Sequence, residues 1–196
     1  DTTEPFLDHM LVALSKYSGV SFDIKAKGDL RHHLIEDVAI ALGAAFAAHT
    51  PATCARYGER TVPMDDALVQ VVIDMGGRPY YRGPLPSGLY DHFMRSFADN
   101  AKATLHVRVL RGTDKHHIIE AAFKALGFAL REALVETGAV FSTKGSVKLD
   151  VQGFELEVVA GGTCLWDRTE FFIVETSLYK FWSSAPLLLE VMKYFD

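Results

Sequence analysis

One pair of repeated segments constrains the fold of this chain more than any other feature of its sequence. The block Gly28–Glu36 (GDLRHHLIE) aligns with Gly112–Glu120 (GTDKHHIIE), 84 positions further along the chain. A shorter match precedes each block, Asp8-His9 against Asp91-His92, at a spacing of 83. Two matches in the same order and in nearly constant register predict an internal duplication, so the chain should fold as two related halves.

Each half shows the same predicted order of a helix, a strand and a second helix. Helical spacing and strand-like alternation of apolar residues predict, in order, a helix at 8–17, a strand at 20–26, a helix at 32–48, a strand at 67–75, a helix at 89–98, a strand at 104–110 and a helix at 116–135. Such repeated units favour an α+β fold in which helices back each sheet. The predicted organisation is a first half-repeat at 1–50, a second at 51–145 and a strand-rich tail at 146–196.

Composition excludes several classes of protein. A net charge of −5 argues against a nucleic-acid partner held by bulk electrostatics. No apolar run is long enough to span a membrane, and residues 1–10 lack the pattern of a signal peptide. The two cysteines, Cys54 and Cys164, cannot form a disulfide framework. We therefore expect a cytoplasmic protein with neither a membrane nor a nucleic acid as partner.

The repeated His-His-x-x-Glu unit places candidate metal ligands at the start of two helices. Positions i and i+4 lie on one face of a helix, so His32 and Glu36 can hold one ion, while His33 points about 100° away. The second copy repeats this geometry, which indicates two metal ions rather than one. With two further histidines the candidate ligands are His9, His32, His33, Glu36, His106, His116, His117 and Glu120. Mixed nitrogen and oxygen ligands favour Mn, Fe or Zn over Mg or Ca.

A simpler interpretation exists for each histidine taken alone. A single His-His pair at a helix start is commonly solvated, but a solvated pair has no reason to recur in a second copy with the same residues at the same spacing. We interpret His49, at a helix end, as a partner of the helix dipole. His92 aligns with His9 and stays open between a ligand and a packing or hydrogen-bonding residue.

These motifs resemble those of the imidazoleglycerol-phosphate dehydratase family of histidine biosynthesis. The resemblance covers about residues 2–145 and includes FLDHML at 6–11, VPMDDAL at 62–68, GRPY at 77–80 and STKG at 142–145. It implies dehydration of imidazoleglycerol phosphate to imidazoleacetol phosphate at two Mn(II) ions, held by the same eight residues. It also implies a duplicated fold of the ribosomal protein S5 domain 2 kind, and a homo-oligomer of 24 subunits with active sites between subunits.

The resemblance implies roles for further residues. Asp8 and Lys124 match proton-handling or orienting side chains, and their simpler interpretations are a helix N-cap and a solvated lysine. The substrate phosphate would be bound by Arg56, Arg78, Ser142, Thr143 and Lys144. A surface salt bridge is the alternative interpretation of each arginine.

The chain departs from the family pattern at both ends. Family members begin with a further strand pair that carries a catalytic Glu, and we expect that pair to be missing here. Strand-like sequence continues instead past the usual end, at 147–151, 154–158 and 171–178. We hypothesise that this tail completes the first sheet and supplies Glu175 or Glu170 as the catalytic carboxylate. The alternative for the tail is an accessory segment that does not complete the sheet. The alternatives for the function of the chain are a di-metal phosphoester hydrolase and a metal-dependent assembly protein without full activity.

Overall fold

A computed structural model describes residues 1–138, 146–149 and 171–174 of the chain. The chain divides into two units, Asp1–Phe141 and Ser142–Asp196. The first unit contains α1 (Pro5–Ser18), α2 (Arg31–His49), β1 (Tyr57–Met64), β2 (Ala67–Asp74), β3 (Tyr80–Arg82), α3 (Gly88–Asn100), β4 (Thr104–Arg111) and α4 (Lys115–Ala133). The second contains β5 (Ser146–Leu149) and β6 (Phe171–Val174). In the described part of the chain, no helix combines the length and apolarity needed to cross a bilayer.

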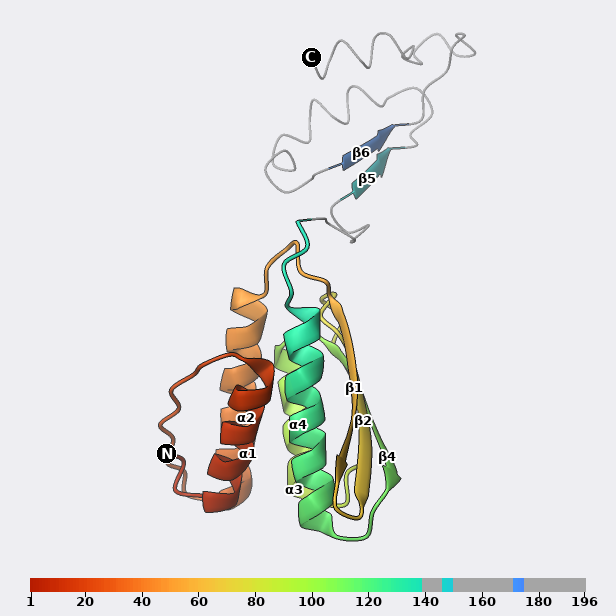
Figure 1. The fold of residues 1–196 in the computed structure, drawn as a ribbon. Helices are drawn as coiled ribbons and strands as arrows, with labels where there is room; N and C mark the ends of the chain where they lie inside the picture. Colours follow the sequence, from red (N-terminus) through yellow and green to blue (C-terminus); the bar gives the residue numbers. More distant parts are fainter. Residues whose placement is uncertain (139–145, 150–170, 175–196) are drawn as a thin grey trace, which may run out of the picture. The chain divides into compact units, whose positions relative to one another are not determined.

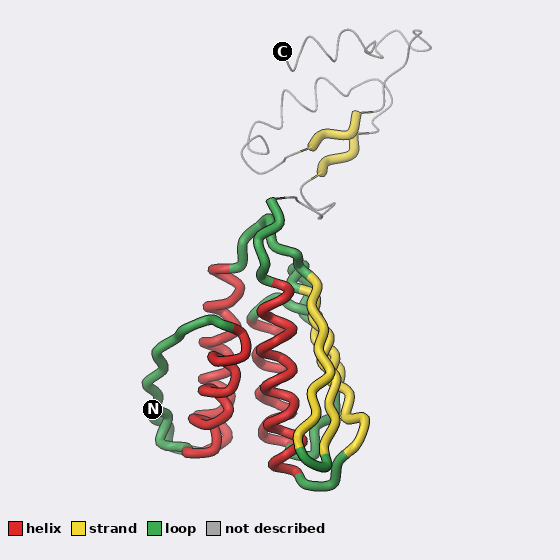
Figure 2. Tube along the Cα trace, in the orientation of Figure 1, coloured by secondary structure: helices red, strands yellow, loops and turns green. Residues whose placement is uncertain are grey.

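The four strands of the first unit form one mixed sheet in the order β1-β2-β4-β3. β1 and β2 make an antiparallel hairpin, β4 pairs antiparallel with β2, and β3 joins β4 in parallel. Apolar residues alternate along β2, so that Val69, Val71 and Ile73 are fully buried on one face. Helices cover that buried face, as Figure 2 shows. The α+β architecture predicted from the sequence is confirmed.

Each helix that bears a His-His pair packs against a helix of the other half. α4 lies between the sheet and α1, whereas α2 packs against α3 (Figure 1). Gly127 of α4 lets α1 approach, because a Cβ there would lie 2.8 Å from Cβ of Tyr17. At its repeat equivalent, Gly43 of α2, a Cβ would lie 2.6 Å from the carbonyl oxygen of Phe97 in α3. Each half therefore packs one helix against a helix of the other half, and the two halves share one core.

The four helices begin at the same end of the first unit. Arg31, at the start of α2, forms a bidentate salt bridge with Glu4, the N-cap residue of α1. The same end holds the β1–β2 turn, whose Asp66 accepts hydrogen bonds from Thr113 and Asp114, just before α4. This end of the unit is where the histidine pairs lie.

The strand predicted at 20–26 is wrong. Residues 19–30 are all described and form no strand, although the predicted alternation is present: Phe22 and Ile24 pack against the core, and Asp23 is exposed. Backbone hydrogen bonds join the segment to Asp1, which donates to the carbonyl of Ile24 at 2.8 Å. An extended segment becomes a strand only when another strand pairs with it along its length, and no described strand does so.

Two strands of the sheet carry no clear signal in the sequence. β1 contains Gly58 and Pro63, both poor strand formers, and β3 is three residues long. Pro63 is tolerated because β1 is an edge strand. Gly58 is required because a Cβ there would collide with the carbonyl oxygen of Ala129 in α4.

In the second unit, β5 pairs in parallel with β6, with Ser146 opposite Phe171. The predicted strands at 147–151 and 171–178 are thus partly confirmed. The strand at 154–158 lies outside the described residues. So do five candidate site residues, Ser142, Thr143, Lys144, Glu170 and Glu175.

Candidate metal centre

A first cluster of candidate ligands forms where α1 meets α4. Nε2 of His9 and Nε2 of His116 lie 3.3 Å and 3.1 Å from the same carboxylate oxygen, Oε2 of Glu120. One ligand atom from each of the three residues lies within 4.8 Å of the others. The Glu120 side chain is 8% exposed, while both imidazoles are about half exposed. The carboxylate is thus buried, both imidazoles are accessible to solvent, and the three ligand atoms lie close enough together to hold one metal ion.

Lys124 also contacts the carboxylate of the first cluster. Its Nζ donates to Oε1 of Glu120 at 2.9 Å, one helical turn further along α4. Burial raises the pKa of Glu120, but the hydrogen bonds from Lys124, His9 and His116 outweigh it and hold the pKa below its usual value. Glu120 is therefore an ionised carboxylate at neutral pH, as a metal ligand must be.

A second cluster forms where α3 meets α2. Nε2 of His92 lies 3.1 Å from Oε1 of Glu36, and His32 lines the same pocket of about 210 Å³. The hydrogen bond from His92 holds the pKa of Glu36 below its usual value. The repeat relates this cluster to the first one, with the contributions of the two halves exchanged. Each cluster takes one histidine from one half and the His-x-x-x-Glu pair from the other.

The structure places His92 against a candidate ligand, so that it hydrogen-bonds to Glu36 whether or not it also binds a metal. His92 contacts Glu36 as His9 contacts Glu120, and its alignment with His9 was the signal for this role. His106 does not join either cluster. It lies exposed on β4, and its ring contacts Tyr80 at 5.5 Å between centroids. His106 thus lies outside both clusters of this chain, as His33 and His117 do, and its role as a ligand stays a prediction.

The second histidine of each pair faces away from its cluster, as the helix geometry predicts. Nδ1 of His117 lies 2.8 Å from Oδ1 of Asp66, and Nδ1 of His33 lies 3.4 Å from Oδ1 of Asp29. The hydrogen bond with Asp66 raises the pKa of His117. Backbone donation from Thr113, together with His117, holds the pKa of the Asp66 carboxyl well below its usual range. These two histidines therefore contact carboxylates that belong to neither cluster.

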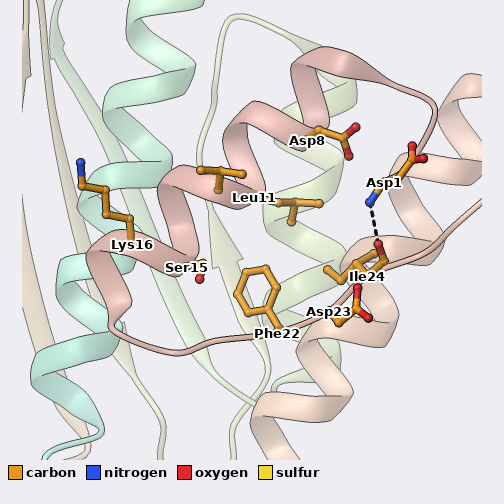
Figure 3. A pocket seen from close by; sticks show the side chains of 9 residues that line it. Asp1, Asp8, Leu11, Ser15, Lys16, Phe22, Asp23 and Ile24 are labelled. Atoms are coloured by element: carbon orange, nitrogen blue, oxygen red, sulfur yellow. Dashed lines mark hydrogen bonds between the residues drawn. The ribbon is translucent and has the colours of Figure 1, made fainter.

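Asp8 stands beside His9 but does not contact the first cluster through a hydrogen bond in the described residues. Its Oδ1 accepts from the backbone N–H and the hydroxyl of Thr2, at 2.9 Å and 2.8 Å. It also lines a pocket of about 560 Å³ between α1 and the segment that contains Phe22, where Figure 3 shows it beside Asp1. None of the residues that line this pocket is a candidate ligand. The geometry of Asp8 therefore favours an anchor for the chain before α1.

The two described phosphate-binding candidates lie far from the first cluster. Arg56 forms a bidentate salt bridge with Asp74, at 2.6 Å and 2.9 Å, where β1 begins and β2 ends. Arg78 is exposed in the loop that follows. The first cluster lies at the opposite end of these eight-residue strands, a separation of roughly 25 Å along the sheet. One chain cannot bring Arg78 and Glu120 to the same small ligand.

Comparisons with known proteins identify the relatives of this chain. Residues 2–130 match the family model described as imidazoleglycerol-phosphate dehydratase. The chain is 44% identical over 169 residues to the enzyme of that name from Kineococcus radiotolerans, covering 75% of this chain and 85% of that protein. It is 46% identical over 161 residues to the one from Pyrobaculum aerophilum, covering 74% and 86%.

Solved structures give the same result. The enzyme from Pyrococcus furiosus superposes with a TM-score of 0.64 at 40% identity, covering 72% of this chain and 86% of that one. The enzyme from Staphylococcus aureus gives 0.65 at 38% identity, covering 70% and 86%. By motif order, fold and sequence identity, the chain belongs to the imidazoleglycerol-phosphate dehydratase family, the dehydratases of histidine biosynthesis.

Proposed function

We propose that this chain dehydrates imidazoleglycerol phosphate to imidazoleacetol phosphate with two Mn(II) ions in each active site. The observation that carries the proposal is the first cluster, in which two imidazoles contact one carboxylate, together with its repeat equivalent, in which His92 contacts Glu36 and His32 lines the same pocket. Imidazole nitrogen with carboxylate oxygen is a donor set that suits Mn(II), and thiolate is absent from both described clusters. Spacing within 4.8 Å in the first cluster supports the fit.

The proposed ligand set keeps the eight residues that the sequence predicts. They are His9, His32, His33, Glu36, His106, His116, His117 and Glu120. Five of these lie in the two clusters, and the three that lie outside them, His33, His106 and His117, complete sites shared with neighbouring copies of the chain. His92 is a further candidate, because its Nε2 lies 3.1 Å from Oε1 of Glu36.

The residues around the first cluster have definable parts in such a reaction. Bound Mn(II) would act as a Lewis acid on an imidazole nitrogen and as a template for the substrate. Glu120 holds His9 and His116 in place. Nζ of Lys124 lies 2.9 Å from Oε1 of Glu120, where it can orient the carboxylate or donate a proton to a departing hydroxyl.

The distribution of these groups supports an active site shared between subunits. The ligands gather where the helices begin, whereas Arg56 and Arg78 lie at the other end of the sheet. A phosphate-bearing substrate needs both, so a second copy of the chain must supply the arginines. This geometry supports a homo-oligomer, and we propose the 24-subunit assembly that the family resemblance implies.

A turnover assay tests the proposal directly. The purified full-length protein is stripped of metal with a chelator, then assayed with imidazoleglycerol phosphate before and after Mn(II) is returned. We expect imidazoleacetol phosphate to form only after Mn(II) returns, without release of free phosphate. Release of phosphate would identify a hydrolase instead. Two bound ions per chain without turnover would indicate a metal-dependent assembly protein.

A further inference from the structure

One carboxylate outside the clusters is held rigidly against a proposed ligand. Asp66 lies in the two-residue turn that joins β1 to β2. Its Oδ2 accepts three hydrogen bonds, from N–H and Oγ1 of Thr113 at 2.7 Å and 3.0 Å and from N–H of Asp114 at 3.1 Å. Its other oxygen, Oδ1, lies 2.8 Å from Nδ1 of His117. The loop before α4 thus fixes the carboxylate, and the carboxylate faces the imidazole.

This contact determines which nitrogen of His117 carries the proton. An ionised carboxylate only accepts hydrogen bonds, so Nδ1 must be the donor and the lone pair of the neutral ring lies on Nε2. A metal-bound histidine needs this division, because one nitrogen binds the ion and the other donates to a fixed acceptor. Nε2 lies 3.4 Å from the carboxylate of Asp65, whose side chain is 73% exposed and does not enclose the ring.

The equivalent histidine of the other half has a looser contact. Nδ1 of His33 lies 3.4 Å from Oδ1 of Asp29, whose side chain is 80% exposed. Asp29 is not the repeat equivalent of Asp66, since the repeat aligns it with Thr113. The contact of Asp66 with His117 is thus a feature of the second half, held by the loop before α4.

We propose that Asp66 is a positioning residue for metal binding, which fixes His117 as the Nδ1–H tautomer and directs Nε2 toward an ion. The inference rests on the proposed function, because it takes His117 as a ligand. Asp66 itself touches neither substrate nor metal in this scheme.

The variant Asp66→Asn separates positioning from loop anchoring. The asparagine oxygen can still accept from Thr113 and Asp114, but its amide then donates to Nδ1 of His117. That reversal places the ring proton on Nε2, the nitrogen that should bind the ion. Titrating the full-length variant with Mn(II) and following free Mn(II) by electron paramagnetic resonance should show affinity at one of the two sites reduced by about 10–100-fold.

Two controls keep the test specific. Asp99→Asn removes the same charge from an exposed position in the last turn of α3 and should leave Mn(II) affinity unchanged. Adding Asp66→Asn to a His117→Ala background should cause no further loss, because Asp66 acts through His117. The urea midpoint of metal-free Asp66→Asn should stay close to that of the unmodified protein.

Three results would overturn the proposal. If the unmodified protein binds two ions and Asp66→Asn binds them equally well, the positioning role fails and the proposed function stands. If the metal-free variant unfolds at markedly lower urea, Asp66 is a loop anchor rather than a positioning residue. If the unmodified protein binds no Mn(II), the positioning role and the metal part of the proposed function both fail.

Discussion

At the scale of single residues, Glu120 is the side chain on which the first cluster depends. It is the one buried member of the three, and it contacts His9, His116 and Lys124 together. The charge of Lys124, whose side chain is 20% exposed, is balanced by this carboxylate. Neutralising Glu120 therefore affects both the metal site and the packing of α1 on α4.

Glu120→Gln should reduce bound Mn(II) from two ions per chain to one. It should also lower the free energy of unfolding of the metal-free protein by about 1–3 kcal/mol, because Lys124 loses its charged partner. Elemental analysis of the purified protein and urea denaturation in chelator measure the two effects. Glu59→Gln, at an exposed position on β1, is the matched control. Retention of both ions in Glu120→Gln would remove this residue from the ligand set.

The contact between His117 and Asp66 should make stability depend on pH. The hydrogen bond raises the pKa of His117 above its usual 6.5, so the folded state binds a proton that the unfolded state releases. This contribution is complete below pH 6.5 and is lost as the pH rises through the raised pKa. His117→Gln should therefore destabilise the metal-free protein more at about pH 6 than at about pH 9. Urea denaturation in chelator at both pH values measures the difference; an equal loss at both would contradict it.

The sequence predicts most of the residues that form the two clusters, but it does not predict the contact of His92 with Glu36. Helix geometry correctly separates His33 from Glu36, because positions along a single helix determine which side chains share a face. The contact between His92 and Glu36 depends on the packing of α3 against α2, which no local pattern contains. The repeat identified His92 as the equivalent of His9 but could not show which helix either would contact.

At the scale of elements, close approach of α4 to β1 depends on Gly58. A side chain at this position would meet the carbonyl oxygen of Ala129, and backbone cannot move aside as a side chain can. Gly58→Ala should lower the free energy of unfolding by about 1–3 kcal/mol. Gly88→Ala, at the open first position of α3, should change it by less than about 1 kcal/mol. Equal effects of the two substitutions in urea denaturation would refute this account.

The elements also show where periodicity is a sufficient signal and where it is not. The sequence predicts all four helices, and in α1, α3 and α4 the signal is one continuous apolar face with a 3.6-residue period. α2 is rich in Ala and has no such single face, so its prediction depends on the repeat that aligns it with α4. The segment at 20–26 has the alternation of a strand but no described strand beside it, and β1 is a strand despite Gly58 and Pro63. Pairing between segments, rather than local sequence, decides both cases.

At the scale of the whole molecule, the separation of the metal ligands from the arginines predicts complementation between defective chains. Glu120→Gln removes a ligand, and Arg78→Met removes a proposed phosphate contact at the opposite end of the sheet. Each variant alone should have little activity. Co-assembled in equal amounts, they should recover about a quarter of the unmodified activity, because a site formed between copies can take its intact part from each.

The measurement is the turnover of mixtures that are dissociated, recombined and supplied with Mn(II). Simple mixing of assembled variants without dissociation is the control and should give no recovery. Absence of recovery after co-assembly would mean that one chain supplies every group to its own site.

The common direction of the four helices has a consequence that the net charge of −5 conceals. Every helix begins at the end where the histidines gather, so four sets of backbone N–H groups, each with the positive end of its dipole, converge there. That local field stabilises carboxylates: Asp114 accepts from the N–H groups of His116 and His117, and Glu36 and Glu120 lie in the second turns of α2 and α4. Part of the negative charge of the chain is thus held in place by backbone N–H groups, beside the histidines that the carboxylates contact.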